Sequence, residues 1–361
     1  MDAWPDPESA FPTVRLSDPG EIAAALPQLL GFRPRESVVL VGLGGPSGGR
    51  VGLTVRADIP AVGQAAAVAG HLARSVRTDR PRGVLVAVVS EAADEAAGGD
   101  PVLPHGSLVR ELVRALTALE VPVPDALLVR RGRWWSYDCP QPCCAPGAGT
   151  PLPGGVPALE VAAVATGVVV AADRDDLAER IARPPGFDRG AMVAACVRAA
   201  GVCSAAIVAD GREAAAEASW SAITAAVARC RPRARAAPLT DDETARILWG
   251  RRDVHVRARA LQFAVGPDAA AAEMLWTICT RRALAPLDAA PATLLAVSAW
   301  LRGDGAMANV ALDRALEGEP GYRLAELLAQ GLAACLAPAD LRRMIGGTLE
   351  VVGRGNLDAV G

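Results

Sequence analysis

The sequence contains no lysine, so all 37 of its basic residues are arginine. This absence excludes Walker-type phosphate loops, Schiff-base enzymes and a lysine general base. Histidine is nearly as scarce, with only His71, His105 and His255, which lie far apart in the chain. Catalysis by histidine requires a partnered geometry, which scattered residues do not indicate. Together these absences favour a non-enzymatic protein.

The chain also lacks an excess of positive charge and long apolar runs. Its net charge is -3 and its pI is about 5.8, whereas nucleic-acid-binding domains usually carry a basic excess. The longest apolar runs have the length of strands, and no basic segment followed by an apolar stretch opens the chain. A membrane span or a signal peptide would require such segments. We therefore expect no nucleic-acid partner, no membrane contact and a cytoplasmic location.

With 361 residues, the chain is long enough for two domains. Near its start, Asp18–Glu21 has the pattern of a helix N-terminus, and Gly31 can end that helix. Ser37–Leu43 is an almost unbroken apolar and β-branched run, which is typical of a strand buried on both faces. After a glycine-rich turn, Val51–Asp58 alternates apolar and polar residues, which predicts an antiparallel hairpin partner.

Helices and strands alternate in the next part of the chain. Helices are expected at Val62–Arg77 and Gly106–Leu119, and strands at Gly83–Ser90 and Asp125–Arg130. Such alternation implies parallel crossover connections. The expected fold class is therefore α/β, with a mixed, mostly parallel sheet that includes one antiparallel hairpin strand.

The second half of the chain has almost only helical spacing. One segment there matches the spacings of a tetratricopeptide unit, through Ala296, Ala308, Leu312, Ala315 and Pro320. Three copies cannot be found, so a helical bundle with one fitting hairpin is the alternative. We expect an all-α domain that binds a protein partner. The expected limits are a flexible tail at 1–12, the α/β domain at 13–186, the helical domain at 187–345 and a flexible tail at 346–361.

One catalytic motif can be rejected from its context. Gly45–Gly49 matches the Gly-x-Ser-x-Gly pattern of a hydrolase nucleophile elbow. That elbow requires a helix directly after the turn, whereas a second strand is predicted here. The glycines are better explained as hairpin residues.

Aromatic residues, cysteine and proline are concentrated between positions 134 and 144. Four residues of this stretch are candidates for ligand binding: Trp134, Trp135, Tyr137 and Asp138. Rigid aromatic area with few polar groups is the usual composition of a binding pocket. If the protein has a chemical site, we expect it near this loop, between the two domains.

The same stretch contains the candidate metal ligands Cys139, Cys143 and Cys144, with zinc as the ion. In a reducing cytoplasm, clustered cysteines more often bind metal or are redox-active than form a static disulfide. However, adjacent cysteines do not easily serve one tetrahedral ion, and no second cysteine pair lies nearby. The alternative is a packing loop with half-buried thiols and no cofactor, and it is the favoured one.

Several blocks of the sequence resemble an actinobacterial family that is catalogued as domain of unknown function 4192. The blocks are Leu29–Pro34 with Ser37–Val39, Arg50–Pro60, Arg133–Cys139 with Cys143 and Cys144, and Leu301–Tyr322. The resemblance covers nearly the whole chain. It implies no activity, substrate or cofactor.

The sequence is therefore compatible with two functional classes. The first is a non-enzymatic binding or regulatory protein whose helical domain presents a groove to a protein partner. The second is an enzyme with a site near the tryptophan and cysteine loop that holds a metal ion. The shortage of histidine and the absence of lysine favour the first class.

Overall fold

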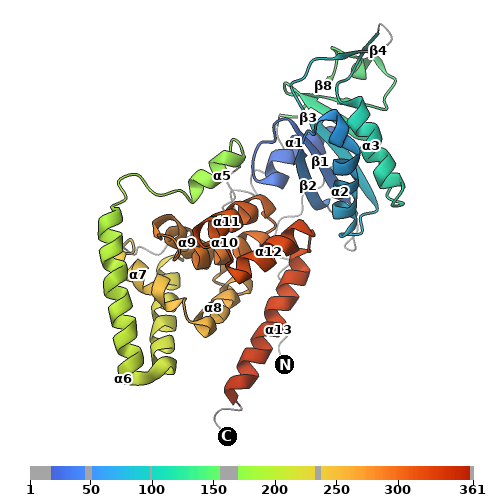
Figure 1. The fold of residues 1–361 in the computed structure, drawn as a ribbon. Helices are drawn as coiled ribbons and strands as arrows, with labels where there is room; N and C mark the ends of the chain where they lie inside the picture. The colour runs from blue at the N-terminus through green and yellow to red at the C-terminus, as the bar shows by residue number, and fades with distance from the viewer. Residues whose placement is uncertain (1–17, 45–50, 98–99, 155–169, 232–236, 358–361) are drawn as a thin grey trace. The chain divides into compact units, whose positions relative to one another are not determined.

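The computed structural model describes residues 18–44, 51–97, 100–154, 170–231 and 237–357 (Figure 1). The chain forms two compact units, Met1–Arg174 and Asp175–Gly361. The domain limits expected from the sequence remain predictions. The expected N-terminal tail, the Gly45–Gly49 loop and a helix expected at Val156–Thr166 lie outside the described residues.

The first unit contains a six-stranded sheet with the order β2-β1-β3-β6-β7-β8. The strands are β1 (Ser37–Leu43), β2 (Val51–Asp58), β3 (Gly83–Val89), β6 (Ala126–Arg130), β7 (Arg133–Ser136) and β8 (Thr150–Pro151). Of the strand pairs that the structure describes in this sheet, β3 and β6 are parallel and the others are antiparallel. The α/β class and the mixed sheet are confirmed, but the expectation of a mostly parallel sheet is wrong.

The position of β1 explains this difference. The strands β2 and β3 are joined through a helix and run in the same direction, as the alternation of elements predicted, but β1 lies between them and pairs antiparallel with both. The residues from Ser37 to Val41 are fully buried in this central position. Strand β1 is therefore an interior strand of the sheet, and its hairpin partner β2 lies at the edge.

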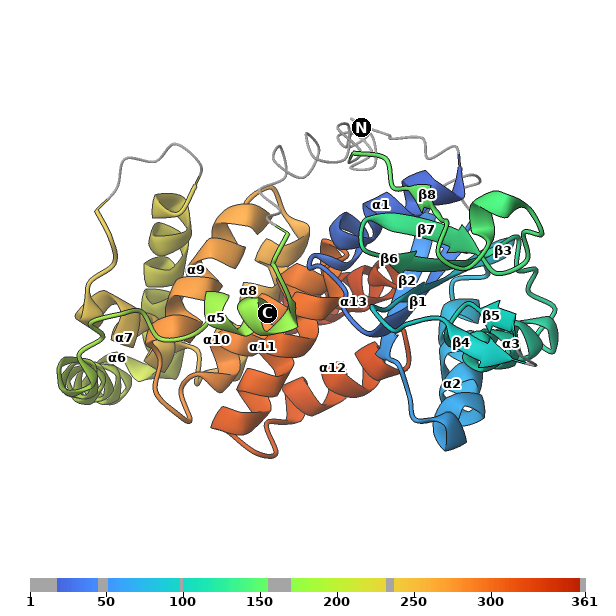
Figure 2. The same ribbon diagram turned by 90° about the horizontal axis from the view of Figure 1, so that it is seen from above.

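Helices cover both faces of the sheet. Helix α1 (Pro19–Leu30) lies on one face, and α2 (Ala65–Arg77) and α3 (Gly106–Thr117) lie on the other (Figures 1 and 2). The predicted ends of α1 are confirmed, because the Asp18 carboxylate accepts from the Glu21 N–H at 2.9 Å and Gly31 has φ +77°. A separate hairpin of β4 (Glu95–Ala97) and β5 (Asp100–Val102) interrupts the connection from β3 to α3.

The second unit is helical, as predicted. Its helices are α5 (Arg174–Arg180), α6 (Arg189–Arg229), α7 (Asp241–Gly250), α8 (Val254–Ala260), α9 (Ala269–Arg282), α10 (Ala289–Leu301), α11 (Gly305–Gly318), α12 (Arg323–Ala333) and α13 (Pro338–Leu357). Gly211 has non-helical backbone angles inside α6, with φ +85°. The two parts of α6 therefore fold back on each other as a hairpin (Figure 1).

Helix α13 spans most of 346–361, the segment that was expected to be a flexible tail, and the flexibility of that segment stays a prediction. Leu341 and Ile345 are buried one turn apart and anchor the start of this helix. Adding residues to an anchored helix costs less free energy than starting one.

The predicted hairpin around Gly303 is present. Helices α10 and α11 pack against each other, and Ala296, Ala308, Leu312 and Ala315 are all buried. The Asp304 carboxylate caps α11 by accepting from the Met307 N–H at 2.9 Å. That this hairpin is a tetratricopeptide-like repeat stays a prediction.

One helix of the described residues, α6, is long and apolar enough to cross a membrane by length and composition alone. Its break at Gly211 divides it into two shorter helices. The expectation of no membrane contact remains a prediction.

Candidate functional site

The candidate site is built on β7 and the loop that follows it. The two tryptophans of β7 point to opposite faces of the sheet because side chains alternate along a strand. Trp134 packs against α1, where a Cβ added to Gly20 would lie 2.7 Å from its Nε1. Trp135 is buried on the other face, and its Nε1 donates to the Ala145 carbonyl at 3.3 Å. The sheet therefore separates these two ligand-binding candidates.

The other two candidates, Tyr137 and Asp138, lie at the start of the loop. The Tyr137 hydroxyl donates to the Pro104 carbonyl at 2.6 Å, which ties the loop to the start of α3. Burial raises the pKa of this hydroxyl, so it remains protonated. Asp138 is exposed. The binding roles of the four residues remain predictions, and Tyr137 alone among them lines a pocket beside the thiols.

The fold brings the three candidate metal ligands together. The sulfur atoms of Cys139, Cys143 and Cys144 all lie within 4.8 Å of one another. The short helix η3 (Pro142–Cys144) directs the adjacent pair so that their Sγ atoms are 3.9 Å apart. A tetrahedral site with zinc–sulfur bonds of about 2.3 Å has ligand separations of about 3.8 Å. The objection that adjacent cysteines fit one ion poorly therefore does not apply to this loop.

The three thiols have different environments. The backbone N–H of Gln141 lowers the pKa of Cys139 and favours its thiolate. Burial raises the pKa of Cys144 to about 11, although the Ser136 N–H, 3.3 Å from its Sγ, opposes this effect. Cys143 is exposed. A bound cation would favour the thiolate form of all three ligands.

An open pocket of about 420 Å³ lies beside the sulfur atoms. Its walls include Tyr137, Cys139 and Cys144 from the loop, and Ser107 and Arg110 from α3. Three protein ligands with an open fourth position are typical of zinc sites that bind water or a substrate, whereas structural sites usually have four protein ligands. The pocket gives a fourth ligand room to approach.

Sequence reasoning missed one cluster of functional residue types. The Ser90 hydroxyl donates to the Glu36 carboxylate at 2.8 Å and lies 3.0 Å from Nε2 of His105. Because its single proton is used on Glu36, the hydroxyl accepts from His105, so His105 cannot act as its base. Ser90 is also buried. The cluster is therefore a structural link between β1, β3 and α3, and no local signal joins residues so far apart in sequence.

The comparisons with known proteins identify the family without adding a function. The family model described as Domain of unknown function (DUF4192) matches residues 19–339. No curated protein and no solved structure matches the chain. The family match includes the whole sheet, the thiol loop and nearly all of the helical unit before α13. The chain therefore belongs to the DUF4192 family.

Proposed function

We propose that the protein is a metal-binding protein whose first unit holds a zinc ion through Cys139, Cys143 and Cys144. The convergence of the three sulfur atoms within 4.8 Å supports this function. Thiolates are preferred ligands of zinc, and the spacing of the adjacent pair suits a tetrahedral ion. The fourth position would be taken by water or by a ligand in the adjoining pocket.

The bound ion would add to the hydrogen bonds that already hold this loop against β7 and Pro104. The Cys139–Cys144 loop follows the last long strands of the sheet and has one short helix of its own. A metal ion that binds only the folded loop adds its binding free energy to the stability of the fold. If water fills the fourth position, the same site could activate that water, which is the basis of the alternative function as an enzyme.

The decisive test is the triple variant Cys139→Ser, Cys143→Ser, Cys144→Ser. We expect one zinc per wild-type chain, little in the variant, and a melting temperature several degrees lower in the variant. Elemental analysis after purification without added metal measures the zinc, and calorimetry measures the melting temperature. A chelator should lower the wild-type melting temperature and leave that of the variant unchanged.

The matched control is Cys203→Ser with Cys335→Ser, two half-buried cysteines of the helical unit. This control should retain the zinc. A metal-free wild type, with a triple variant that melts at nearly the same temperature, would show that the loop is a packing surface.

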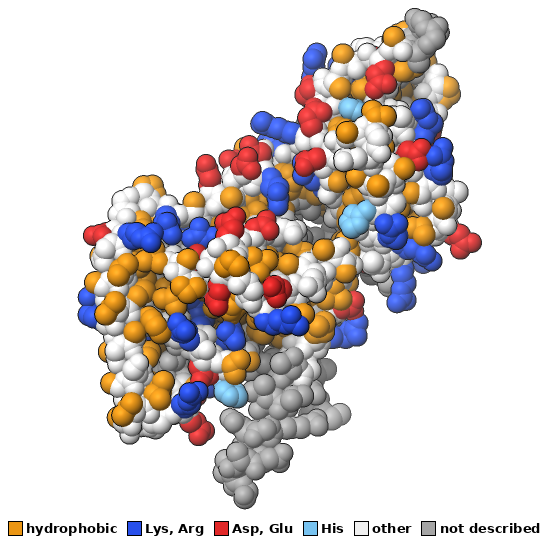
Figure 3. Space-filling model, viewed as in Figure 1, with side chains coloured by type: hydrophobic (Ala, Val, Ile, Leu, Met, Phe, Trp, Pro, Cys, Tyr) orange, Lys and Arg blue, Asp and Glu red, His pale blue; other side chains and the backbone are white. Residues whose placement is uncertain are grey.

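We also propose, from the surface of the helical unit, that it binds a protein partner. The first part of α6, residues 189–210, exposes Val193, Val197, Val202, Ile207 and Val208. Hydrophobic side chains gather along this edge of the unit (Figure 3). Exposed apolar side chains that gather on one surface commonly mark an interaction site.

The variant Val197→Glu with Val208→Glu tests this surface. The two side chains are 67% and 87% exposed, so the fold should persist while partner capture from a cell lysate falls sharply. The control is Ala225→Glu with Ala228→Glu, on the exposed side of the returning part of α6. Equal capture by both variants would rule out this face as the partner surface.

The environment of the cysteines supports a cytoplasmic location as part of the proposal. All eight cysteines are free thiols. Free thiols persist in a reducing compartment and are oxidised outside it. We retain the proposals of no nucleic-acid partner, which rests on the net charge of -3, and of no membrane contact.

A further inference from the structure

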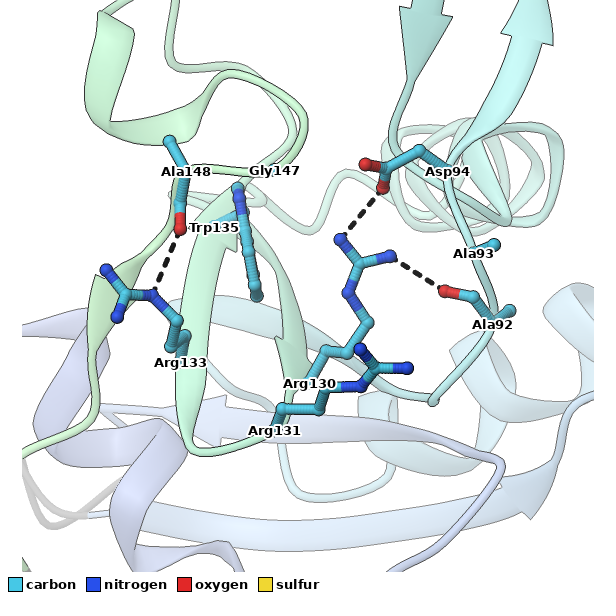
Figure 4. A pocket seen from close by; sticks show the side chains of 9 residues that line it. All are labelled: Ala92, Ala93, Asp94, Arg130, Arg131, Arg133, Trp135, Gly147 and Ala148. Atoms are coloured by element: carbon cyan, nitrogen blue, oxygen red, sulfur yellow. Dashed lines mark hydrogen bonds and ion pairs between the residues drawn. The ribbon is translucent and has the colours of Figure 1, made fainter.

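A second pocket lies at the carboxyl ends of β3 and β6 and has a volume of about 620 Å³. Its walls come from the loop after β3, from β6 and β7, and from the turn before β8 (Figure 4). In open α/β sheets, ligands bind beyond the carboxyl ends of parallel strands. This pocket lies beside the one parallel pair that the structure describes in the sheet.

Arg130 is a preorganised cation in the wall of this pocket. Its side chain is largely buried, its Nη1 donates to the Ala92 carbonyl at 2.7 Å, and its Nη2 lies 2.8 Å from Oδ1 of Asp94. The guanidinium also lies 4.9 Å from the ring centroid of Trp135. These contacts hold the group in one orientation (Figure 4). A charge that is already ordered loses little entropy when a ligand binds.

Two more arginines extend the positive charge. Arg131 and Gly132 form a tight turn between β6 and β7, with φ of +49° and +71°. Arg131 has a weak, exposed ion pair with Glu91 at 3.2 Å. Arg133 donates from Nε to the Ala148 carbonyl at 3.0 Å and from Nη2 to the Gly149 carbonyl at 2.9 Å. These carbonyl contacts orient the guanidinium without neutralising its charge.

The pocket therefore has an excess of positive charge. Three guanidinium groups line it, whereas Asp94 and Glu91 are the carboxylates paired with them. The exposed pair with Glu91 is worth little free energy, because solvent and salt screen it. An oxyanion could replace Glu91 at Arg131 and accept charge-assisted hydrogen bonds in the forked geometry that guanidinium groups favour.

We propose that this pocket binds a small molecule through a phosphate or carboxylate group. Arg131 and Arg133 contact the oxyanion, and Arg130, fixed by Asp94, supplies additional positive charge. The volume lies within the usual range of small-molecule sites, roughly 300–1,000 Å³. The site does not depend on a metal ion at the cysteines.

The test is calorimetric titration of the full chain at constant ionic strength with three probes: inorganic phosphate, adenosine monophosphate and citrate. Phosphate and citrate distinguish phosphate from carboxylate recognition, and adenosine monophosphate shows whether a larger group adds affinity. We expect saturable binding of at least one probe. In the variant Arg131→Gln with Arg133→Gln, that binding should weaken by about tenfold or more, since charged hydrogen bonds are lost.

The matched control is Arg74→Gln with Arg77→Gln, two exposed arginines in the last turn of α2. Its affinity should equal that of the wild type. Repeating the titrations in the Cys139→Ser, Cys143→Ser, Cys144→Ser background separates binding in this pocket from binding to a metal ion, and the affinity should persist there. The proposal is overturned if none of the probes binds, if the Arg131 and Arg133 variant binds as tightly as the control, or if binding disappears with the three thiols.

Discussion

The variant Leu40→Asp is expected to yield no soluble folded protein. Leu40 lies in the middle of β1, is fully buried, and faces Val55 of β2 and Val86 of β3 in the sheet. An unpaired charge in such a core costs several kcal/mol, compared with a total stability of about 5–15 kcal/mol. Soluble expression and the thermal unfolding curve measure the effect.

Two further substitutions make this result specific. Val62→Asp introduces the same charge at a side chain that is 85% exposed, and it should leave expression and melting nearly unchanged. Val39→Asp should be less severe than Leu40→Asp, because the cross-strand neighbour of Val39 is Arg56, which can offset the charge. A soluble Leu40→Asp protein that melts cooperatively would show that β1 is not central.

The second large effect is a gain of stability from Arg251→Met. Arg251 is fully buried in the helical unit, and its three guanidinium nitrogens have no hydrogen-bond partner among the described residues. Its guanidinium lies 5.0 Å from the ring centroid of Trp276, and burial lowers its pKa. Replacing a poorly compensated buried charge with an apolar side chain of similar length often stabilises a protein by about 1–4 kcal/mol.

Urea unfolding and, separately, calorimetry should both show this increase in the free energy of unfolding. The control is Arg252→Met, since Arg252 is exposed and lies 5.0 Å from the ring centroid of Trp249. That change should alter the stability by about 0.5 kcal/mol or less. If Arg251→Met instead loses several kcal/mol of stability, the guanidinium must have a counter-charge in the folded protein. The nearby Cys279 sulfur is the first candidate. Burial, however, raises the pKa of that thiol and so opposes a thiolate there.

The local features of the fold could be predicted from short stretches of sequence. Asp18 and Gly31 mark the ends of α1, and Thr240 and Glu243, three residues apart, form a capping box at the start of α7. The unbroken apolar run of Ser37–Leu43 indicated a strand buried on both faces, as found. These features depend on residues a few positions apart, so their spacing in the sequence is also their spacing in space.

The arrangement of the sheet depended on tertiary structure. Helices and strands alternate from β2 to β6, as the sequence predicts. However, β1 lies between β2 and β3, and its two pairings help to make most strand pairs antiparallel. Neighbours in a sheet are chosen by packing between distant segments, because a strand can pair on either edge without changing its own pattern of burial.

The candidate sites show the same division. The composition of Trp134–Cys144 indicated where function could lie, but only the fold separated Trp134 from Trp135 and brought three sulfur atoms within 4.8 Å. The link between Ser90 and His105 and the pocket around Arg130 were also absent from any local pattern. The spacing of residues in the sequence determines which helices and strands form and which of their faces are buried. Which side chains meet is decided by backbone turns and long-range packing, because residues far apart in the chain contribute to them together.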